Sequence, residues 1–213
     1  MSVWLLCETA VFRLGVSGAA VTVNNAAGWP ETRHSTDALS ARLVELQVTV
    51  GEGPCADAYQ AGGPILVADL DSSAIQRRWP LFAPLAVEAG ARALFTFPLC
   101  VGTIRLGILA LHRIEPRPLG PATLADSLVF ADFALRLLLD EQAGLPTRDG
   151  GLPLHNPQVH QATGMISAQL NVEMEDAFAR LRARAFTDQR PLAELAADIV
   201  ARRLRFDPTG EAR

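Results

Sequence analysis

Apolar residues recur at helical or strand spacing through the first part of the chain. Over residues 3–14 they repeat every three or four positions, which predicts an amphipathic helix. Small and β-branched residues at 18–24 predict a strand, and a second strand is expected at 65–68. Two helices are expected between them, one from the cap candidates at 36–37 to about 47 and a shorter one at 54–59 with a proline in its first turn.

The clearest local pattern is a pair of half-buried runs at 93–99 and 103–112, which flank Val101-Gly102 and predict a β-hairpin. Apolar residues at 124, 128, 131, 135 and 138 then predict a long helix. Residues 144–154 are rich in Gly and Pro and are interpreted as a linker. We therefore expect a first domain over residues 1–143.

Three shorter apolar stripes follow the linker. They predict helices over 159–170, 177–185 and 191–200, the first ending at Asn171 and the last beginning with Pro191. Each helix is too short to be stable alone, so the three must pack together. This second domain is expected at residues 155–206.

The basic residues are unusual because all 19 are Arg and none is Lys. The absence of Lys is interpreted first as codon bias in a GC-rich genome. The net charge of -4 argues against a protein that coats nucleic acid with its whole surface. Residues 152–205, however, hold 7 Arg against 6 acids, so an anionic partner is expected at the C-terminal part.

Chemical motifs are sparse. The three cysteines, Cys7, Cys55 and Cys100, lie far apart without His at ligand spacing, so we expect structural thiols, no metal and no cofactor. No P-loop, GxSxG or HExxH motif occurs, which argues against an enzyme. Neither a secretory signal nor an apolar stretch of membrane-spanning length is present, so a cytoplasmic location and no membrane partner are expected.

The first 143 residues resemble a GAF-type sensor domain. The resemblance rests on the order of elements and on Pro98-Leu-Cys-Val-Gly-Thr-Ile-Arg-Leu-Gly-Ile-Leu-Ala-Leu in the hairpin. Gly51-Glu-Gly-Pro-Cys-Ala-Asp-Ala is similar to a GAF subgroup common in actinobacteria. The resemblance implies an α+β fold, with an antiparallel sheet flanked by helices.

The C-terminal unit resembles the ANTAR domain, a three-helix RNA-binding module of transcription antitermination regulators. The matching segments are Gln161-Ala-Thr-Gly-Met-Ile, Asp176-Ala-Phe-Ala-Arg-Leu-Arg-Ala-Arg-Ala-Phe and Arg190-Pro-Leu-Ala-Glu-Leu-Ala-Ala-Asp-Ile-Val. Together the two resemblances imply a regulator that senses a signal and binds tandem hairpins in nascent leader RNA. Many relatives carry a basic residue where this chain has Thr163, so a phosphate contact there would be lost or replaced by a hydroxyl.

RNA binding requires planar, forked donors on a basic face. Arg180 and Arg184 share one face of the second C-terminal helix, whereas Arg182 lies nearly opposite and could serve RNA contact or a structural salt bridge. Arginines near 202–205 are expected on any helix end. The candidate RNA-binding residues are Gln161, Thr163, Gly164, Arg180, Arg182, Arg184 and Arg190.

The long helix at 124–143 is the expected homodimerisation element, because its stripe is close to heptad spacing. The alternative is that the stripe packs on the sheet of its own domain. A small molecule of unknown identity could occupy a pocket of the sensor domain, although its aromatic residues would serve equally as core. The candidate ligand-binding residues are Trp29, Tyr59, Asp69, Trp79, Phe82 and Phe97.

Two other functions stay open on the sequence alone. Cys55 could be the reactive thiol of a GAF enzyme resembling methionine sulfoxide reductases, although no resolving cysteine is close in sequence. The chain could also be a protein-interaction adaptor whose two domains only dimerise.

Overall fold

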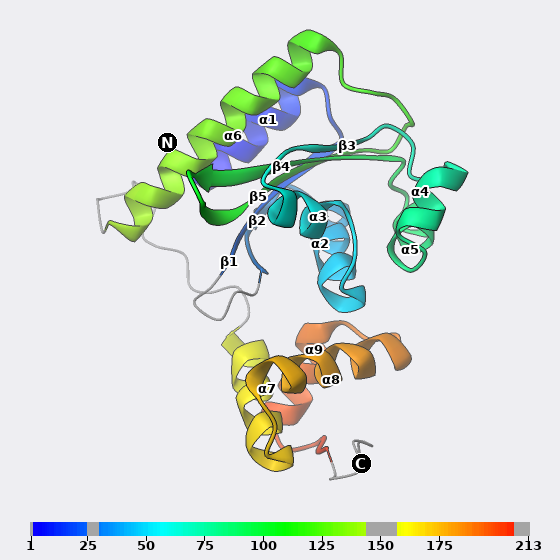
Figure 1. Ribbon diagram of the computed structural model, residues 1–213, viewed down its shortest axis with the longest axis vertical. Coiled ribbons are helices and arrows are strands. Elements are labelled where there is room, and N and C mark those ends of the chain that lie inside the picture. The colour runs from blue at the N-terminus through cyan, green and yellow to red at the C-terminus, as the bar shows by residue number, and fades with distance from the viewer. Residues whose placement is uncertain (1, 25–29, 144–156, 207–213) are drawn as a thin grey trace. The chain divides into compact units, whose positions relative to one another are not determined.

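A computed structural model of the protein describes residues 2–24, 30–143 and 157–206. The elements fall into two compact units, one containing the sheet, α1, α2 as far as Gln47 and α3 to α6, the other containing α7 to α9 (Figure 1). Residues 144–154, expected to form the linker, lie outside the described residues. The domain limits at 143 and 155 therefore stay predictions.

The first unit is built on a five-stranded antiparallel sheet in the order β2-β1-β5-β4-β3. The expected hairpin is present, with Ala93 opposite Arg113 and Val101 opposite Ile104. Gly102 closes it with a φ of 59°, a left-handed conformation that suits glycine. The strands are β1 (Gly18–Asn24), β2 (Pro30–Ser35), β3 (Ile65–Val67), β4 (Ala93–Val101) and β5 (Ile104–Arg113).

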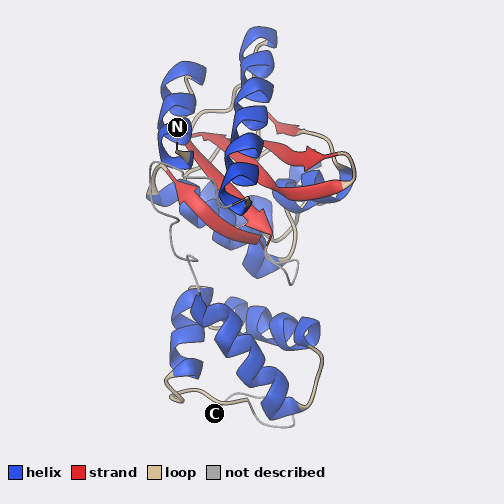
Figure 2. Cartoon of the chain, turned by 90° about the vertical axis from the view of Figure 1, so that its left-hand side faces the viewer, coloured by secondary structure: helices blue, strands red, loops and turns tan. Residues whose placement is uncertain are grey.

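Helices cover both faces of the sheet. In Figures 1 and 2, α1 and α6 lie on one face, and α2 and α3 lie on the other. Asp37 caps α2, because its Oδ1 accepts a hydrogen bond from Ser40 N at 2.8 Å. The helices of this unit are α1 (Val3–Leu14), α2 (Ala38–Val50), α3 (Pro54–Ala61), α4 (Ser73–Arg78), α5 (Phe82–Glu88) and α6 (Pro121–Gln142).

Successive side chains of β4 point to opposite faces of the sheet. Phe95, Phe97 and Leu99 are buried in the core beneath α1 and α6. The residues between them face the opposite layer, where Thr96 Oγ1 donates a hydrogen bond to Pro54 O at the start of α3, 3.1 Å away. The odd-numbered residues from Phe95 to Leu99 therefore face α1 and α6, whereas Thr96 faces α3.

The second unit packs α7 (Pro157–Leu170), α8 (Met174–Thr187) and α9 (Leu192–Val200) against one another. Its core is small and fully buried, with Ile166, Leu181 and Leu195 at its centre. As expected, α7 ends at a left-handed Asn171, which has a φ of 52°. The predicted α+β class, with an antiparallel first unit and a three-helix second unit, is confirmed.

Some elements differ from the expectations. The strand β2 and the short helices α4 and α5 were not predicted, and Pro191 is the N-cap of α9 rather than its first residue. Among the described residues, no helix is long and apolar enough to span a bilayer.

Candidate RNA-binding surface and sensor pocket

The three arginines of α8 differ in what they contact. Arg180 is exposed and, within the described residues, makes no ion pair. Arg184 is half-buried, and its Nε lies 2.7 Å from Asp188 Oδ2 one turn later. The Arg182 guanidinium lies over the ring of Phe178, 5.8 Å from the ring centroid. Arg180 is thus the α8 cation with the most accessible charge.

Arg190, which precedes α9, belongs to an ion-pair network around Asp198. Arg190 Nη2 lies 2.7 Å from Asp198 Oδ2, and Arg203 approaches Asp198 Oδ1 through Nη2 at 2.7 Å and Nε at 2.9 Å. The hydrogen bonds from Arg190 and Arg203 lower the pKa of Asp198. One carboxylate therefore connects the two ends of α9 and shares its charge between two arginines.

The predicted residues on α7 have different surroundings. Gln161 is exposed, whereas Thr163 is fully buried and its hydroxyl donates to Val159 O one turn earlier, at 2.8 Å. That hydroxyl is therefore not presented to a phosphate. Gly164 is partly exposed, and a Cβ added there would meet nothing within 4 Å, so helix packing does not require a glycine.

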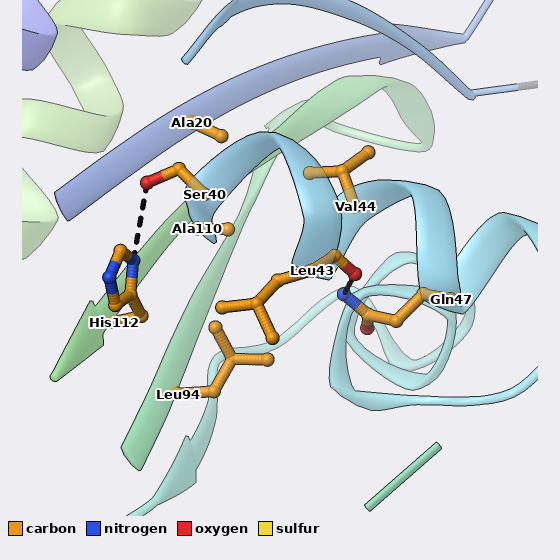
Figure 3. Close-up of a pocket in the computed structure, with 8 residues that line it drawn as sticks. All are labelled: Ala20, Ser40, Leu43, Val44, Gln47, Leu94, Ala110 and His112. Atoms are coloured by element: carbon orange, nitrogen blue, oxygen red, sulfur yellow. Dashed lines mark hydrogen bonds between the residues drawn. The ribbon is translucent and has the colours of Figure 1, made fainter. Parts of the chain in front are cut away.

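The sensor unit has a very small cavity between α2 and the sheet (Figure 3). Its volume is about 10 Å³, close to the room that one water molecule needs. The lining residues come from α2 and from strands β1, β4 and β5: Ala20, Ser40, Leu43, Val44, Gln47, Leu94, Ala110 and His112. The structure thus has room here for a group the size of a water molecule.

A buried polar network lies at one side of this cavity. Ser40 Oγ is 3.2 Å from His112 Nδ1, and the same hydroxyl is 2.8 Å from Asp37 Oδ2. Burial lowers the pKa of His112, and the nearby Asp37 charge offsets this only in part. Burial alone would raise the pKa of Asp37, but hydrogen bonds from Ser40 and Thr36 outweigh it and keep that pKa below its ordinary value. The sequence alone does not predict this network, although the place of His112 on the hairpin is an available signal.

None of the described residues predicted to bind a ligand lines the cavity. Trp79 and Phe82 are buried in the packing near α4 and α5, and Tyr59 donates its hydroxyl to Arg105 O at 3.2 Å. Asp69 Oδ1 accepts a hydrogen bond from Asp71 N and pairs with Arg92, at 3.1 Å and 3.2 Å.

Phe97 is placed differently from the expectation. It lies on the opposite face of the sheet from the cavity, because residues of its parity on β4 point toward α1 and α6. Trp29 lies outside the described residues. Ligand binding by this set stays a prediction.

The motif Gly51-Glu-Gly-Pro-Cys has a structural explanation. Glu52 Oε1 accepts hydrogen bonds from the backbone N–H groups of Leu81 and Phe82, at 2.6 Å and 2.9 Å, where α5 begins. The side-chain amide of Gln47 makes two hydrogen bonds with Cys55: its Oε1 accepts from Cys55 N at 2.7 Å, and its Nε2 donates to Cys55 Sγ at 3.2 Å. Burial raises the pKa of Cys55 to about 12. A protonated thiol is a weak nucleophile, so these surroundings do not favour a catalytic role for Cys55.

Fold and site together define a two-part protein, with an α+β unit and a helical unit rich in arginine. A GAF domain model matches residues 5–138, and an ANTAR domain model matches residues 155–200. The chain therefore belongs to the GAF-domain family and has the GAF–ANTAR architecture, that of an RNA-binding antitermination regulator with a sensory domain. Regulators of this architecture are as a rule not enzymes.

Solved structures support the fold of the first unit. The GAF domain of the cyanobacteriochrome TePixJ is 16% identical, with a TM-score of 0.52, covering 65% of this chain and 88% of that one. The GAF domain of a phosphoenolpyruvate-protein phosphotransferase from Coxiella burnetii is 17% identical (TM-score 0.52, 66% and 82% covered). That of the Acinetobacter phosphotransferase is 12% identical (TM-score 0.50, 65% and 80% covered). Among curated proteins, none matches the chain at a significant level.

Proposed function

We propose that the protein binds tandem hairpins in nascent leader RNA through α7–α9 and thereby prevents formation of a terminator, acting in the cytoplasm. The observation that carries this proposal is the arginine face of the second unit, where Arg180 extends from α8 without an ionic partner among the described residues. An accessible guanidinium forks onto phosphate oxygens, and each such contact releases counterions from the RNA.

The GAF unit is proposed to control this binding through α6. This helix is the last element before the chain continues to the second unit. Its final turn carries Glu141, whose Oε2 lies 2.6 Å from Arg33 Nη2 on the edge strand β2. Because both side chains are mostly buried, the ion pair is screened less than a surface pair. A displacement of Arg33 on β2 would therefore alter the position of Glu141 in the last turn of α6.

A homodimer would place two RNA-binding units together, so that two hairpins are held at high effective concentration. Most of the stripe predicted as a dimer seam packs onto the sheet of its own unit, with Ala131 and Leu138 in the core. Leu128 of that stripe stays exposed, together with Val129 and Phe133, which lie outside the stripe: the three are 47%, 53% and 45% accessible. We propose that this set is the contact with a second copy.

The RNA-binding proposal is tested with the full chain and a leader RNA that contains two short hairpins. Arg180→Ala should weaken binding and flatten the dependence of log affinity on log salt by about one, because one phosphate contact is lost. The matched control is Arg77→Ala, which removes an exposed arginine from α4 in the sensor unit. Equal affinity for scrambled RNA at moderate salt, or no binding to any hairpin as an adaptor would show, contradicts the proposal.

A further inference from the structure

Three side chains stand on successive turns of α8. Phe178, Arg182 and Phe186 are spaced four residues apart, so they follow one another along one side of the helix. Phe178 is the inner member, only 7% exposed, and packs in the core of the second unit. The Arg182 guanidinium lies over its ring. Phe186 is the outer member, and it is 44% exposed.

The neighbours of Phe186 on α8 include two small side chains and one accessible arginine. Ala179 and Ala183, which are exposed on the same side of α8, carry only a methyl group each. Because a methyl group is short, these two side chains cannot cover the half-exposed Phe186 ring. Arg180 extends from the same helix with its charge accessible. An exposed apolar ring on the same helix as a guanidinium that has no ionic partner among the described residues is complementary to a ligand that is both aromatic and anionic.

RNA has this combination, since an unpaired base offers a π face and its backbone offers phosphates. Sequence-specific RNA recognition mostly targets single-stranded loops, whose bases stack on aromatic side chains or on guanidinium planes. An aliphatic protein partner would not gain from the adjacent arginines, so the charge favours RNA as the occupant.

We propose that Phe186 is a base-stacking residue, which takes an unpaired nucleotide from a hairpin loop. The inference rests on the proposed RNA-binding function and adds to it the part of the RNA that is recognised. Phe186 lies outside the set of predicted RNA-binding residues, and its contribution would come from stacking on a base rather than from charge.

The test uses the full chain and a leader hairpin with 2-aminopurine at a loop position. Phe186→Leu keeps an apolar side chain of similar size and removes the π face. It should weaken binding by about 5- to 100-fold and abolish the change in 2-aminopurine fluorescence on binding. The slope of log affinity against log salt should stay unchanged, because no phosphate contact is lost. Phe186→Tyr should restore both affinity and fluorescence change.

Met174→Ala is the matched control, because it removes another exposed apolar side chain from the same helix and should bind as the wild type does. If the wild type binds the hairpin and Phe186→Leu binds equally well, stacking is refuted while the proposed function stands. A failure of Phe186→Tyr to restore binding, or an altered oligomeric state of Phe186→Leu, also overturns the inference and indicates a protein contact. If the wild type binds no hairpin, the proposed function itself fails.

Discussion

At the scale of single residues, His112 is the group with the most constrained surroundings. It is 3% exposed, faces Ser40 and Asp37 from β5, and lies beside Gly18, where a Cβ would overlap both Asp37 and the imidazole. A buried imidazole that gains only partial compensation from a carboxylate favours the neutral form. The folded protein therefore resists protonation of His112 more strongly than the unfolded chain does.

This asymmetry predicts the direction of a pH dependence. The unfolded chain takes up a proton near the ordinary pKa of 6.5, whereas the folded chain does so only at lower pH. Stability is therefore full above pH 6.5 and falls below it. Urea unfolding at pH 7.5 and 5.5 should show this loss in the wild type and a smaller one in His112→Asn. His160→Gln, in the second unit, should keep the wild-type difference, and an unchanged loss in His112→Asn contradicts the prediction.

Single positions also show where sequence patterns were sufficient. The period-two pattern of the hairpin was enough to predict β4 and β5, and the same period shows that Phe97 and Leu94 face opposite layers. The network of Arg190, Asp198 and Arg203 was not predicted, because it joins residues that come together only when α9 is packed and terminated. Thr163 is a predicted RNA-binding residue because of its place in the motif, whereas the structure buries its side chain in α7.

At the scale of elements, length and amphipathicity decided what could be predicted. The helices α1, α6 and α8 have long apolar stripes and were expected close to their observed limits. The strand β2 has the sequence Pro-Glu-Thr-Arg-His-Ser, and an edge strand with polar residues lacks an apolar alternation. The helices α4 and α5 have six and seven residues, too few for a periodic signal.

The exposed apolar face of α6 predicts a change of oligomeric state. Phe133→Asp places a charge in the middle of the proposed contact with a second copy, where it would have to be desolvated. Sedimentation velocity should find the wild type as a dimer and Phe133→Asp as a monomer with an unchanged helix content. Met174→Asp, which adds the same charge at an exposed apolar position of the second unit, should stay dimeric. A dimeric Phe133→Asp would place the contact on another element.

At the scale of the whole molecule, the two units have separate buried cores. The first gathers around Phe95, Phe97 and Leu109 beneath α1 and α6, and the second around Ile166, Leu181 and Leu195. All three tryptophans, at positions 4, 29 and 79, belong to the first unit. Tryptophan fluorescence therefore reports on the sensor unit, while far-ultraviolet circular dichroism also includes the helices of the second.

Separate cores predict separate unfolding. Leu195→Ala removes a fully buried side chain and should cost the second unit about 2–5 kcal/mol. In a urea titration, part of the circular dichroism signal should be lost at lower urea, while the fluorescence transition stays where it is in the wild type. A fluorescence transition that shifts together with the circular dichroism signal would show one cooperative unit instead.

The separate cores have a consequence for inheritance. If the two units unfold separately, a chain whose second unit is destroyed would fold its first core and would present Leu128, Val129 and Phe133 on α6. In a cell that makes both this chain and the intact one, mixed dimers would form and carry one RNA-binding unit in place of two. Loss of α9 would then be dominant over the normal allele, whereas loss of the exposed α6 face would be recessive.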